Sequence, residues 1–336
     1  MLIPTLNLGR IIPRAILSPS LPSRSFAIFF LSALLATSAG SSLLAQQKDP
    51  RDLTYYVDAH PYLDDPLKEL EKKIPELKGV FPAADEQALP VILEKTGRNV
   101  DDFFRHTVDL IAREDITQQR LNGMDAVVTS QQVRDSYLII RHGDELKANV
   151  EEFRMDSNGD RMEHVGLKQG YVVTFGFALI CNYFSSYFQS ESRFRYIGDQ
   201  RLGSRDTYVV AFAQQPGLAT LHITMNGGNG SIVNLLMQGI AWLDKQNFQI
   251  IRMRTDLLAP HPEIGLEIQT TDVTFNKVQL LDVSNPLWLP KQVKAYVKFK
   301  MPAPKPGKFI ELRYQNEHRY EDYRRYRVCV KMKICQ

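Results

Sequence analysis

A period of two in the apolar residues, broken by a short polar turn, limits the folds open to this chain more than any other feature. It is clearest in residues 239–258 (GIAWLDKQNFQIIRMRTDLL), where Ile240 and Trp242 alternate with Ala241 and Leu243. The polar run DKQN follows, and the returning arm alternates apolar residues with arginines. Because successive side chains of a strand point to opposite faces, two such arms around a polar turn indicate a β-hairpin.

Segments with the same alternation lie on both sides of this hairpin, which predicts one large antiparallel sheet. They cover residues 108–121, 133–141, 147–155, 205–214, 265–281, 291–300 and 310–314. In the segment 265–281 the phase changes, since Leu266 and Ile268 lie on one face and Val273 and Phe275 on the other. A bulge near residues 270–271 would produce this change, and bulges bend sheets. A short helical turn is predicted at residues 231–238.

Two apolar segments have helical spacing instead. Residues 89–107 carry apolar side chains three and four positions apart, which predicts an amphipathic helix that packs on the sheet. The second segment, residues 170–190, is the most apolar part of the chain after residue 45, and it predicts a helical insertion. It is either ordinary core or a lid over an apolar cavity. If it is a lid, the candidate ligand-binding residues are Phe177, Phe184, Tyr187 and Phe188.

The first 45 residues have the composition of a secretory signal peptide. They contain Arg10, Arg14 and Arg24 but no Asp, Glu or Lys, and the apolar run 26–35 precedes small residues. Cleavage after Ala45 or after Gly40 fits this pattern, and a retained membrane anchor is the alternative. The sequence thus predicts an exported protein of the periplasm or cell envelope, without a stable transmembrane span once the signal is removed.

Charge and composition after the signal exclude one class of partner. The chain has 41 basic and 38 acidic residues, so removal of the three signal arginines leaves equal numbers of each sign. Nucleic-acid binding needs a concentrated basic surface, and we therefore expect no nucleic-acid partner. Residues 46–88 are rich in Pro and charge, which predicts a linker that is partly helical or disordered before a β domain at residues 89–336.

Motifs of catalysis and metal binding are missing. The chain lacks the Gly-x-Ser-x-Gly, His-Glu-x-x-His and Cys-x-x-Cys patterns, and its seven histidines stand apart in sequence. Residues 156–160 (DSNGD) lack the spacing of a calcium loop and predict a turn. The acidic pair Glu151 and Glu152 is expected on a solvated segment. A disulfide between Cys329 and Cys335 would require a turn in the tail. We expect no enzyme activity, no cofactor and no bound metal.

Several motifs resemble those of a bacterial protein family. The hairpin GIAWLDKQNFQIIRMRTDLLAP, the strand TTDVTFNKV, LWLPKQVKAYV and the closing YQNEHRYEDYRRYRV resemble uncharacterised exported proteins of the acidobacterial type. These are related to the outer-membrane lipoprotein-carrier fold. The resemblance covers residues 89–328 and implies a strongly curved, incomplete antiparallel β-barrel whose concave side is covered by helices. It also implies an apolar lining that receives acyl chains.

The sequence therefore predicts a mainly β protein: a curved antiparallel sheet or half-barrel with an N-terminal helix and a helical insertion. The leading functional hypothesis is a non-enzymatic periplasmic carrier whose apolar concavity takes a lipid or a lipoprotein acyl chain. The alternative is a structural or interaction module of the cell envelope without a small-molecule ligand. Such a module would hold an envelope protein through strand edges and the Tyr- and Arg-rich C-terminal tail.

Overall fold

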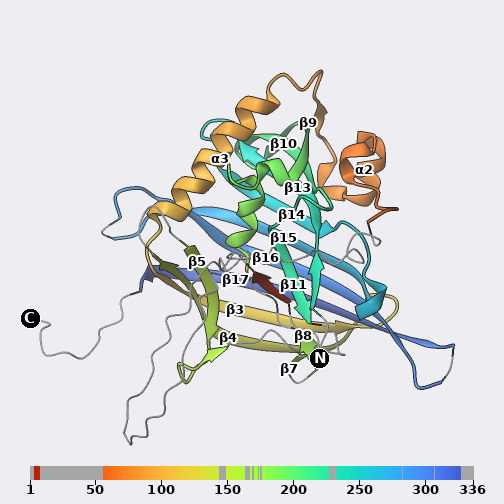
Figure 1. Cartoon of the computed structure of the whole chain (residues 1–336). Helices are drawn as coiled ribbons and strands as arrows, with labels where there is room; N and C mark the ends of the chain where they lie inside the picture. Colours follow the sequence, from red (N-terminus) through yellow and green to blue (C-terminus); the bar gives the residue numbers. More distant parts are fainter. Residues whose placement is uncertain are drawn as a thin grey trace, which may run out of the picture.

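The computed structural model describes most of the chain after residue 55 (Figure 1). The described residues are 4–7, 56–143, 149–162, 167–168, 170–172, 174, 176–226, 232–281, 283–305 and 307–326. Cys329 and Cys335 lie outside these ranges, as do most of the proposed signal peptide and the first part of the predicted linker. The predictions made for those segments stay predictions.

Within the described residues, 12 strands form one antiparallel sheet that is not closed into a barrel. Its spatial order is β2 (Phe81–Pro82), β9 (Ser192–Leu202), β10 (Arg205–Gln214), β13 (Met237–Asp244), β14 (Ile250–Leu257), β15 (Leu266–Val278), β16 (Leu287–Pro302), β17 (Phe309–Arg325), β3 (Leu110–Leu121), β4 (Val127–His142), β5 (Asn149–Met155) and β6 (Arg161–Met162). The long last strand β17 lies between β16 and β3. The predicted fold class, a mainly β open antiparallel sheet, is confirmed.

The hairpin predicted at residues 239–258 is formed by β13 and β14 near the middle of the β9–β15 half of the sheet. All residues of β13 are buried, because protein covers this part of the sheet on both faces. Ala241 and Leu243 belong to the core cluster on one face, and Ile240 and Trp242 to the cluster on the other. The alternate residues of this strand therefore face two different hydrophobic cores, and neither face of the strand is exposed to solvent.

Trp242 is fully buried, and its indole Nε1 donates a hydrogen bond of 2.6 Å to Oε1 of Gln200 on β9. We expect Trp242→Phe to lower the free energy of unfolding by about 1–2 kcal/mol, since it removes both packed volume and this hydrogen bond. Urea unfolding followed by circular dichroism measures the loss. Trp288→Phe, at a half-buried position, is the control and is expected to cost less; an equal or larger cost there would contradict the argument.

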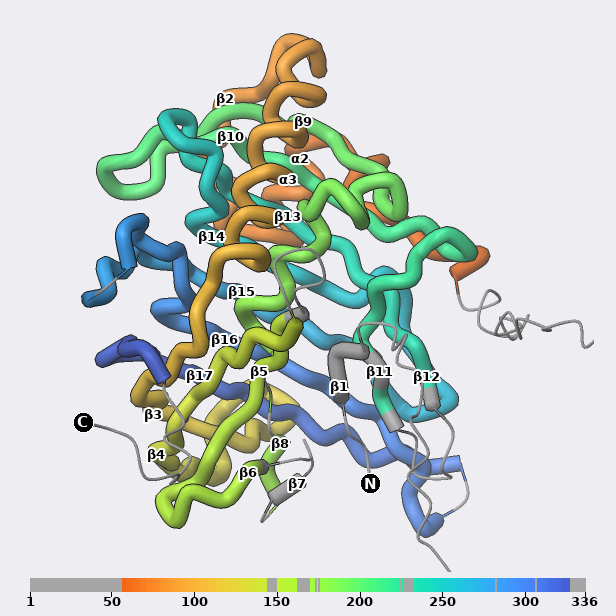
Figure 2. The backbone as a smooth tube through the Cα atoms, turned by 60° about the vertical axis from the view of Figure 1, so that its left-hand side comes forward, coloured from red at the N-terminus to blue at the C-terminus, as the bar shows by residue number. Residues whose placement is uncertain are grey.

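Register shifts bend the sheet. The pairing of β15 with β16 shifts between Leu266 and Ile268 and again between Thr274 and Phe275. Further shifts occur in the pairs β9–β10, β13–β14, β3–β4 and β17–β3. The predicted bulge near residues 270–271 is therefore misplaced, because the phase of the side chains already changes at Ile268, which is exposed. Bulges increase the local twist and bend of strands, and they account for the curvature in Figure 2.

Helix α3 (Leu89–His106) lies on the concave face of the curved sheet, as the helical spacing of residues 89–107 predicted (Figures 1 and 2). The predicted helical insertion lies beside it as two short 3-10 helices, η3 (Leu179–Phe184) and η4 (Gln189–Glu191). Gly97 allows this contact, since a Cβ atom there would lie 2.6 Å from Nε2 of Gln189. The side chain of Ser185 also donates a hydrogen bond of 2.6 Å to Oδ1 of Asp101 on α3.

The convex face is covered by residues 56–80, which were predicted to be part of a linker. They form η1 (Tyr62–Asp64), α2 (Leu67–Lys73) and η2 (Pro75–Leu77). Leu70, Ile74 and Leu77 are fully buried in one core cluster with Val209 and Trp242 of the sheet. The segment is partly helical, as predicted, and its described part packs against the β domain.

Smaller elements complete the structure. Strands β1 (Pro4–Asn7), β11 (His222–Asn226) and β12 (Ile232–Leu235) form a separate antiparallel sheet, and β7 (Leu167–Lys168) pairs with β8 (Tyr171–Val172). A last 3-10 helix, η5 (Pro262–Ile264), precedes β15. The short helical turn predicted at residues 231–238 is wrong: β12 and the start of β13 occupy this segment, because the apolar residues Val233, Leu235 and Met237 follow strand spacing.

Candidate functional site

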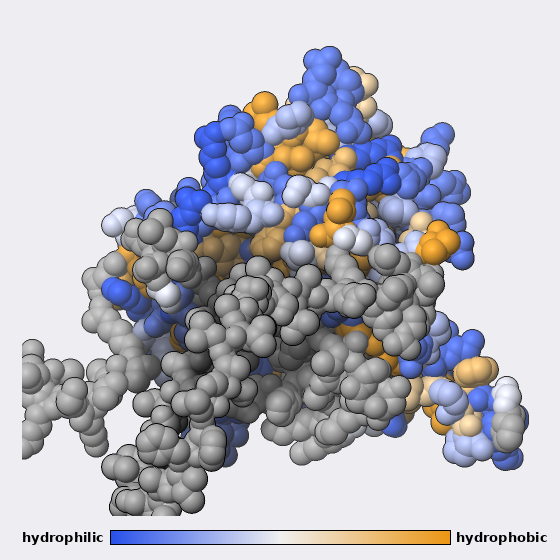
Figure 3. Space-filling model, in the orientation of Figure 1, coloured by the Kyte–Doolittle hydropathy of each residue, from blue (hydrophilic) through white to orange (hydrophobic). Residues whose placement is uncertain are grey.

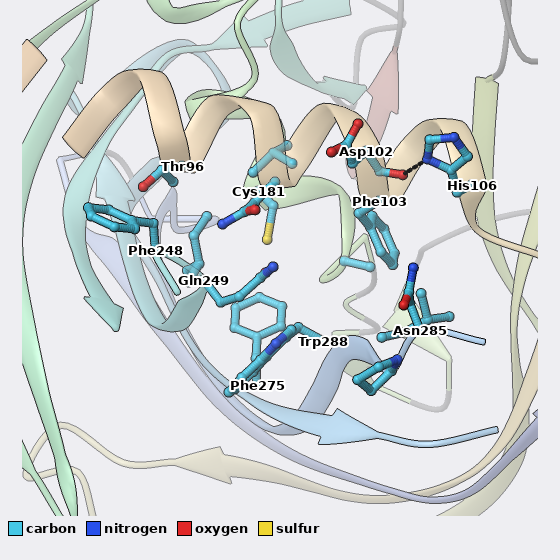
Figure 4. Close-up of a pocket in the computed structure, with 16 residues that line it drawn as sticks. Thr96, Asp102, Phe103, His106, Cys181, Phe248, Gln249, Phe275, Asn285 and Trp288 are labelled. Carbon is cyan, nitrogen blue, oxygen red and sulfur yellow. Dashed lines mark hydrogen bonds between the residues drawn. The ribbon is translucent and has the colours of Figure 1, made fainter. Parts of the chain in front are cut away.

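A cavity of about 380 Å³ lies between α3 and the concave face of the sheet (Figure 4). Five parts of the chain line it: α3, the segment 178–181, the β13–β14 turn with the start of β14, β15, and the residues at the start of β16. Phe275 and Trp288 form one wall from the sheet side, opposite the helix. Phe103 and Phe248 lie toward the two ends of the cavity in the same view. Aromatic and aliphatic side chains thus make up most of the lining.

Polar side chains gather where the cavity meets the helix and the loops. Asn99, Asp102 and His106 come from α3, Gln249 from the β13–β14 turn, and Asn285 from the loop before β16. Asn99 also donates a hydrogen bond of 2.7 Å to the backbone oxygen of Asn247, which fixes α3 to the turn. An apolar lining with a few polar groups is the usual composition of a small-molecule site, and sites of this kind occupy about 300–1,000 Å³.

Thr96 lines the cavity from α3 but is fully buried, and its Oγ1 has no hydrogen-bond partner among the described residues. An unsatisfied buried hydroxyl costs about 1–3 kcal/mol. A positive charge lies near the same end of the cavity, since Nζ of Lys95 is 4.5 Å from the ring centroid of Phe248.

The four residues predicted as ligand-binding occupy different positions. Phe177 and Phe184 are buried in the core, where Phe184 packs against Phe194 and Phe212. Phe188 is partly buried against the same core, and Tyr187 is 73% exposed. Their role in binding stays a prediction, because the described cavity is lined instead by two other residues of this segment, Ala178 and Cys181.

The segment 179–184 forms the 3-10 helix η3 and not an α-helix. Helix type alone does not separate the two groups of residues, since positions three apart, such as 181 and 184, share a face of a 3-10 helix. Cys181 lines the cavity, whereas Phe184 packs against Phe194 and Phe212. The thiol of Cys181 has a raised pKa because it is buried, so the thiolate is disfavoured.

A buried network of charged and polar side chains lies elsewhere on the concave face, in strands β3, β5 and β17. Oε1 of Glu114 accepts hydrogen bonds from Arg154 (2.7 Å), from Tyr320 (2.7 Å) and, at 2.8 Å, pairs with Nδ1 of His318. Burial alone would raise the pKa of Glu114, but the Arg154 guanidinium and the hydrogen bond with His318 lower it to about 2. Burial lowers the pKa of His318, which leaves Arg154 as the cation that neutralises Glu114.

A second buried carboxyl connects the sheet to its cover. Glu152 accepts hydrogen bonds from the Tyr137 hydroxyl (2.5 Å) and from the backbone N–H of Leu179 (2.6 Å). Burial raises its pKa to about 7, although these hydrogen bonds act in the opposite direction. Asn316 and His318 hold the same cover, since they contact the backbone oxygen of Val172 (2.6 Å) and Oγ1 of Thr174 (2.9 Å).

The expectation that Glu151 and Glu152 lie together on a solvated segment is therefore half wrong. The Glu151 side chain is 40% exposed and lies near Arg161 and His142, whereas Glu152 is buried. The signal that could have separated them is the phase of the strand: Val150, Glu152 and Arg154 lie on one face, and an apolar residue marks that face as the inner one.

The tail proposed for protein interaction is part of the sheet as far as it is described. Tyr320 is buried in the network, and the hydroxyl of Tyr323 donates to the backbone oxygen of Pro290 at 2.8 Å. Both lie on β17, which has a partner strand on each side, so this part of the chain offers no free strand edge.

No group of three or more His, Cys, Asp or Glu side chains in the described part of the chain could hold a metal ion. None of its helices is both long and apolar enough to cross a membrane.

Comparison with known proteins gives distant similarities in structure. The solved structures similar to this chain include a DUF1329 family protein from Desulfovibrio piger (10% identity, TM-score 0.35, 72% of this chain and 94% of the other). They also include a putative outer membrane lipoprotein-sorting protein domain from Vibrio parahaemolyticus (12% identity, TM-score 0.34, 69% of this chain and 91% of the other). A third is a LolA superfamily protein from Nitrosomonas europaea (10% identity, TM-score 0.29, 70% of this chain and 94% of the other). No family model and no curated protein matches the chain. These similarities, with TM-scores of 0.29–0.35, are too distant to assign a function to the chain.

Proposed function

We propose that this protein is a non-enzymatic carrier that binds an acyl chain of a lipid or a lipoprotein in the cavity under α3. The observation that supports the proposal is the 380 Å³ cavity itself, with its aromatic and aliphatic lining and a few polar groups. Transfer of an alkyl chain from water into such a lining is favourable, by about 0.8 kcal/mol for each buried methylene group. A cavity of this size accepts a single chain, not a whole two-chain lipid.

The polar groups suit the end of such a chain. The side-chain amide of Gln249, which lines the cavity, can donate a hydrogen bond to a carboxyl or ester oxygen. The ammonium group of Lys95, above the Phe248 ring, favours a negatively charged ligand end. Catalysis is not favoured, because burial disfavours the Cys181 thiolate, and within the described residues the ring of the nearby His106 hydrogen-bonds to a backbone oxygen, that of Asp102, and to no nucleophile.

The proposal includes an exported protein. A signal peptide in residues 1–45 would deliver the chain to the periplasm or cell envelope, where lipid and lipoprotein acyl chains have to cross an aqueous space. N-terminal sequencing of the protein recovered from a bacterial periplasm tests this step. A mature chain that begins at residue 46 or 41 agrees with it, whereas a chain that keeps Met1 and stays with the inner membrane contradicts it.

Fluorescence of Trp288 provides a direct test of binding, because this indole lines the cavity and Trp242 is buried on the other face of the sheet. Titration of the periplasmic protein with a fatty acid brominated along its chain is expected to quench one of the two tryptophans. Trp288→Phe removes the quenching but not the binding, which native mass spectrometry can detect as a one-to-one complex.

A large side chain introduced into the cavity is expected to prevent the ligand from binding. Cys181→Trp places an indole in the space from a half-buried position, and we expect it to weaken fatty-acid binding by at least about ten-fold, or about 1.4 kcal/mol. Cys181→Ala is the matched control and should bind as the unmodified protein does. If both variants bind equally while keeping the same circular dichroism spectrum, the ligand does not occupy this cavity and the proposed site is wrong.

A further inference from the structure

Large apolar side chains are exposed together at one end of the sheet. Phe309 is 58% exposed and Ile310 45% exposed at the start of β17, and Met301 lies opposite Ile310 on β16. Met124, in the β3–β4 turn, is 87% exposed, and Val127 at the start of β4 is exposed as well. Exposed apolar residues that occur singly need no explanation, but a contiguous group marks an interaction surface.

Strand register places these residues on one rim. Lys298 on β16 pairs with Arg313 on β17, Arg313 with Leu121 on β3, and Leu121 with Val127 on β4. The β16–β17 hairpin continues beyond this row and projects from the body at the lower right of Figure 1, near the β3–β4 turn. Figure 3 shows hydrophobic and hydrophilic residues together on the same projection.

The projecting hairpin is open on both of its faces. Phe309 and Ile310 are consecutive residues of a strand, so their side chains point to opposite faces, and both are exposed. No described element of the chain therefore covers either face. The apolar residues form a tip, not a groove, so the surface has the wrong shape to receive a helix or a strand of a protein partner.

Positive charge surrounds the apolar tip. Nζ of Lys300 lies 4.9 Å from the ring centroid of Phe309, and Lys305 and Lys308 occupy the loop of the hairpin. Within the described residues, neither Lys305 nor Lys308 forms an ion pair. The nearby acidic residues are already paired, Glu311 with Lys298 and Arg313, and Asp125 with Arg313. The rim therefore presents unneutralised positive charge next to apolar side chains.

We propose that this rim, composed of Met301, Phe309, Ile310 and Met124 with Lys305 and Lys308, docks on a membrane surface that contains anionic phospholipid. Apolar side chains on a projecting turn enter the boundary between headgroups and acyl chains, and lysines beside them stay with the headgroup phosphates. The complementary charge selects an anionic surface, and the convex tip selects a lipid surface over a protein groove. The inference is independent of the acyl-binding cavity, which lies under α3.

Vesicle flotation of the periplasmic protein tests the proposal. We expect flotation with vesicles of phosphatidylethanolamine and phosphatidylglycerol, and little flotation with vesicles of phosphatidylcholine alone. Raised salt is expected to weaken the binding because it screens the lysines. Phe309→Trp adds a depth readout: its emission should shift to shorter wavelength with the anionic vesicles and be quenched by lipids that carry bromine on their acyl chains.

Two pairs of substitutions separate the apolar from the electrostatic part. The double variant Phe309→Asp, Ile310→Asp should abolish flotation because it removes apolar side chains that are proposed to enter the membrane. Both side chains are exposed, so the variant is expected to keep the fold. Lys305→Glu with Lys308→Glu should weaken binding to anionic vesicles by roughly ten-fold or more and remove its dependence on salt. Phe81→Asp is the matched control, since Phe81 is 75% exposed on β2 at one edge of the sheet, and it should float as the unmodified protein does.

Three outcomes would overturn the docking proposal: no flotation with anionic vesicles, flotation that survives the Phe309 and Ile310 substitutions, or an equal loss in the Phe81 control. Fatty-acid quenching of Trp288, measured on the same variants, keeps this result apart from the proposed function. A variant that loses flotation but still binds fatty acid supports a separate docking surface. Loss of both activities in the rim variants would contradict it.

Discussion

Replacement of Arg154 by methionine is expected to lower the free energy of unfolding by about 3–5 kcal/mol, the cost of leaving one charge of a buried pair without its partner. Both Arg154 and Glu114 are almost completely buried, and the neutral His318 cannot replace the lost positive charge. Methionine keeps much of the volume of the arginine stem, so the loss reports mainly on charge. Urea unfolding at neutral pH, followed by circular dichroism, measures it.

Two controls define the outcome. Arg134→Met removes an exposed ion pair with Asp115 and is expected to cost less than about 1 kcal/mol. The double variant Glu114→Gln, Arg154→Met removes both charges and should recover part of the stability. If Arg154→Met costs no more than Arg134→Met, then Glu114 and Arg154 are not buried together as described.

The pH dependence of stability should change when Glu152 is replaced by glutamine. The folded protein holds the pKa of this carboxyl near 7, above the ordinary value of 4.5. Between these two values the folded state binds more protons than the unfolded state, so Glu152 lowers stability as the pH rises from about 4.5 to about 7. The integrated effect is on the order of 2–3 kcal/mol.

The measurement is the free energy of unfolding of both proteins between pH 4.5 and pH 8. Other groups titrate in both proteins, so the difference between the two curves isolates Glu152. We expect Glu152→Gln to gain stability relative to the unmodified protein as the pH rises from 4.5 through 7, and the difference to level off near pH 8, where ionisation of Glu152 in the folded protein is nearly complete. Glu151→Gln, at the exposed neighbouring position, is the control. Parallel curves for the Glu152 variant and the unmodified protein would contradict a raised pKa.

Local sequence patterns predicted the elements of this fold because their cause is local. The period of two in residues 239–258 and 291–300 follows from the geometry of a strand, and the spacing in residues 89–107 from that of an α-helix. The pairing of β17 with β3 has no such signal. It joins residues about 200 positions apart, such as Arg313 and Leu121, and only the whole sheet determines it.

Composition alone left the packing of residues 46–88 undetermined. Proline and charge suggested a linker, yet three apolar residues in the described part, Leu70, Ile74 and Leu77, are fully buried. These three residues pack on the face of the sheet that carries Val209 and Trp242. In the sequence, this face appears only as the alternate positions of each strand, and nothing there shows that another segment covers it. Whether such a face is covered by protein or by water depends on a distant segment.

The cavity was beyond the reach of sequence for a related reason. The aromatic insertion contributes Ala178 and Cys181 to the lining, and neither residue carries a distinctive sequence signal. Phe248, Phe275 and Trp288 come from three other parts of the chain. The buried charges behave similarly, since Glu114 and Arg154 resemble surface residues until their strands are paired.

The position of β17 between β16 and β3 also determines when the sheet can be completed during synthesis of the chain. Strands β3, β4 and β5 appear early, but β3 lacks the neighbour on one side until residues 309–325 have left the ribosome. Contacts so distant in sequence form slowly, and an early half-sheet exposes unpaired backbone. Nascent chains of this protein are therefore expected to need protection from aggregation until residues 309–325 have been made.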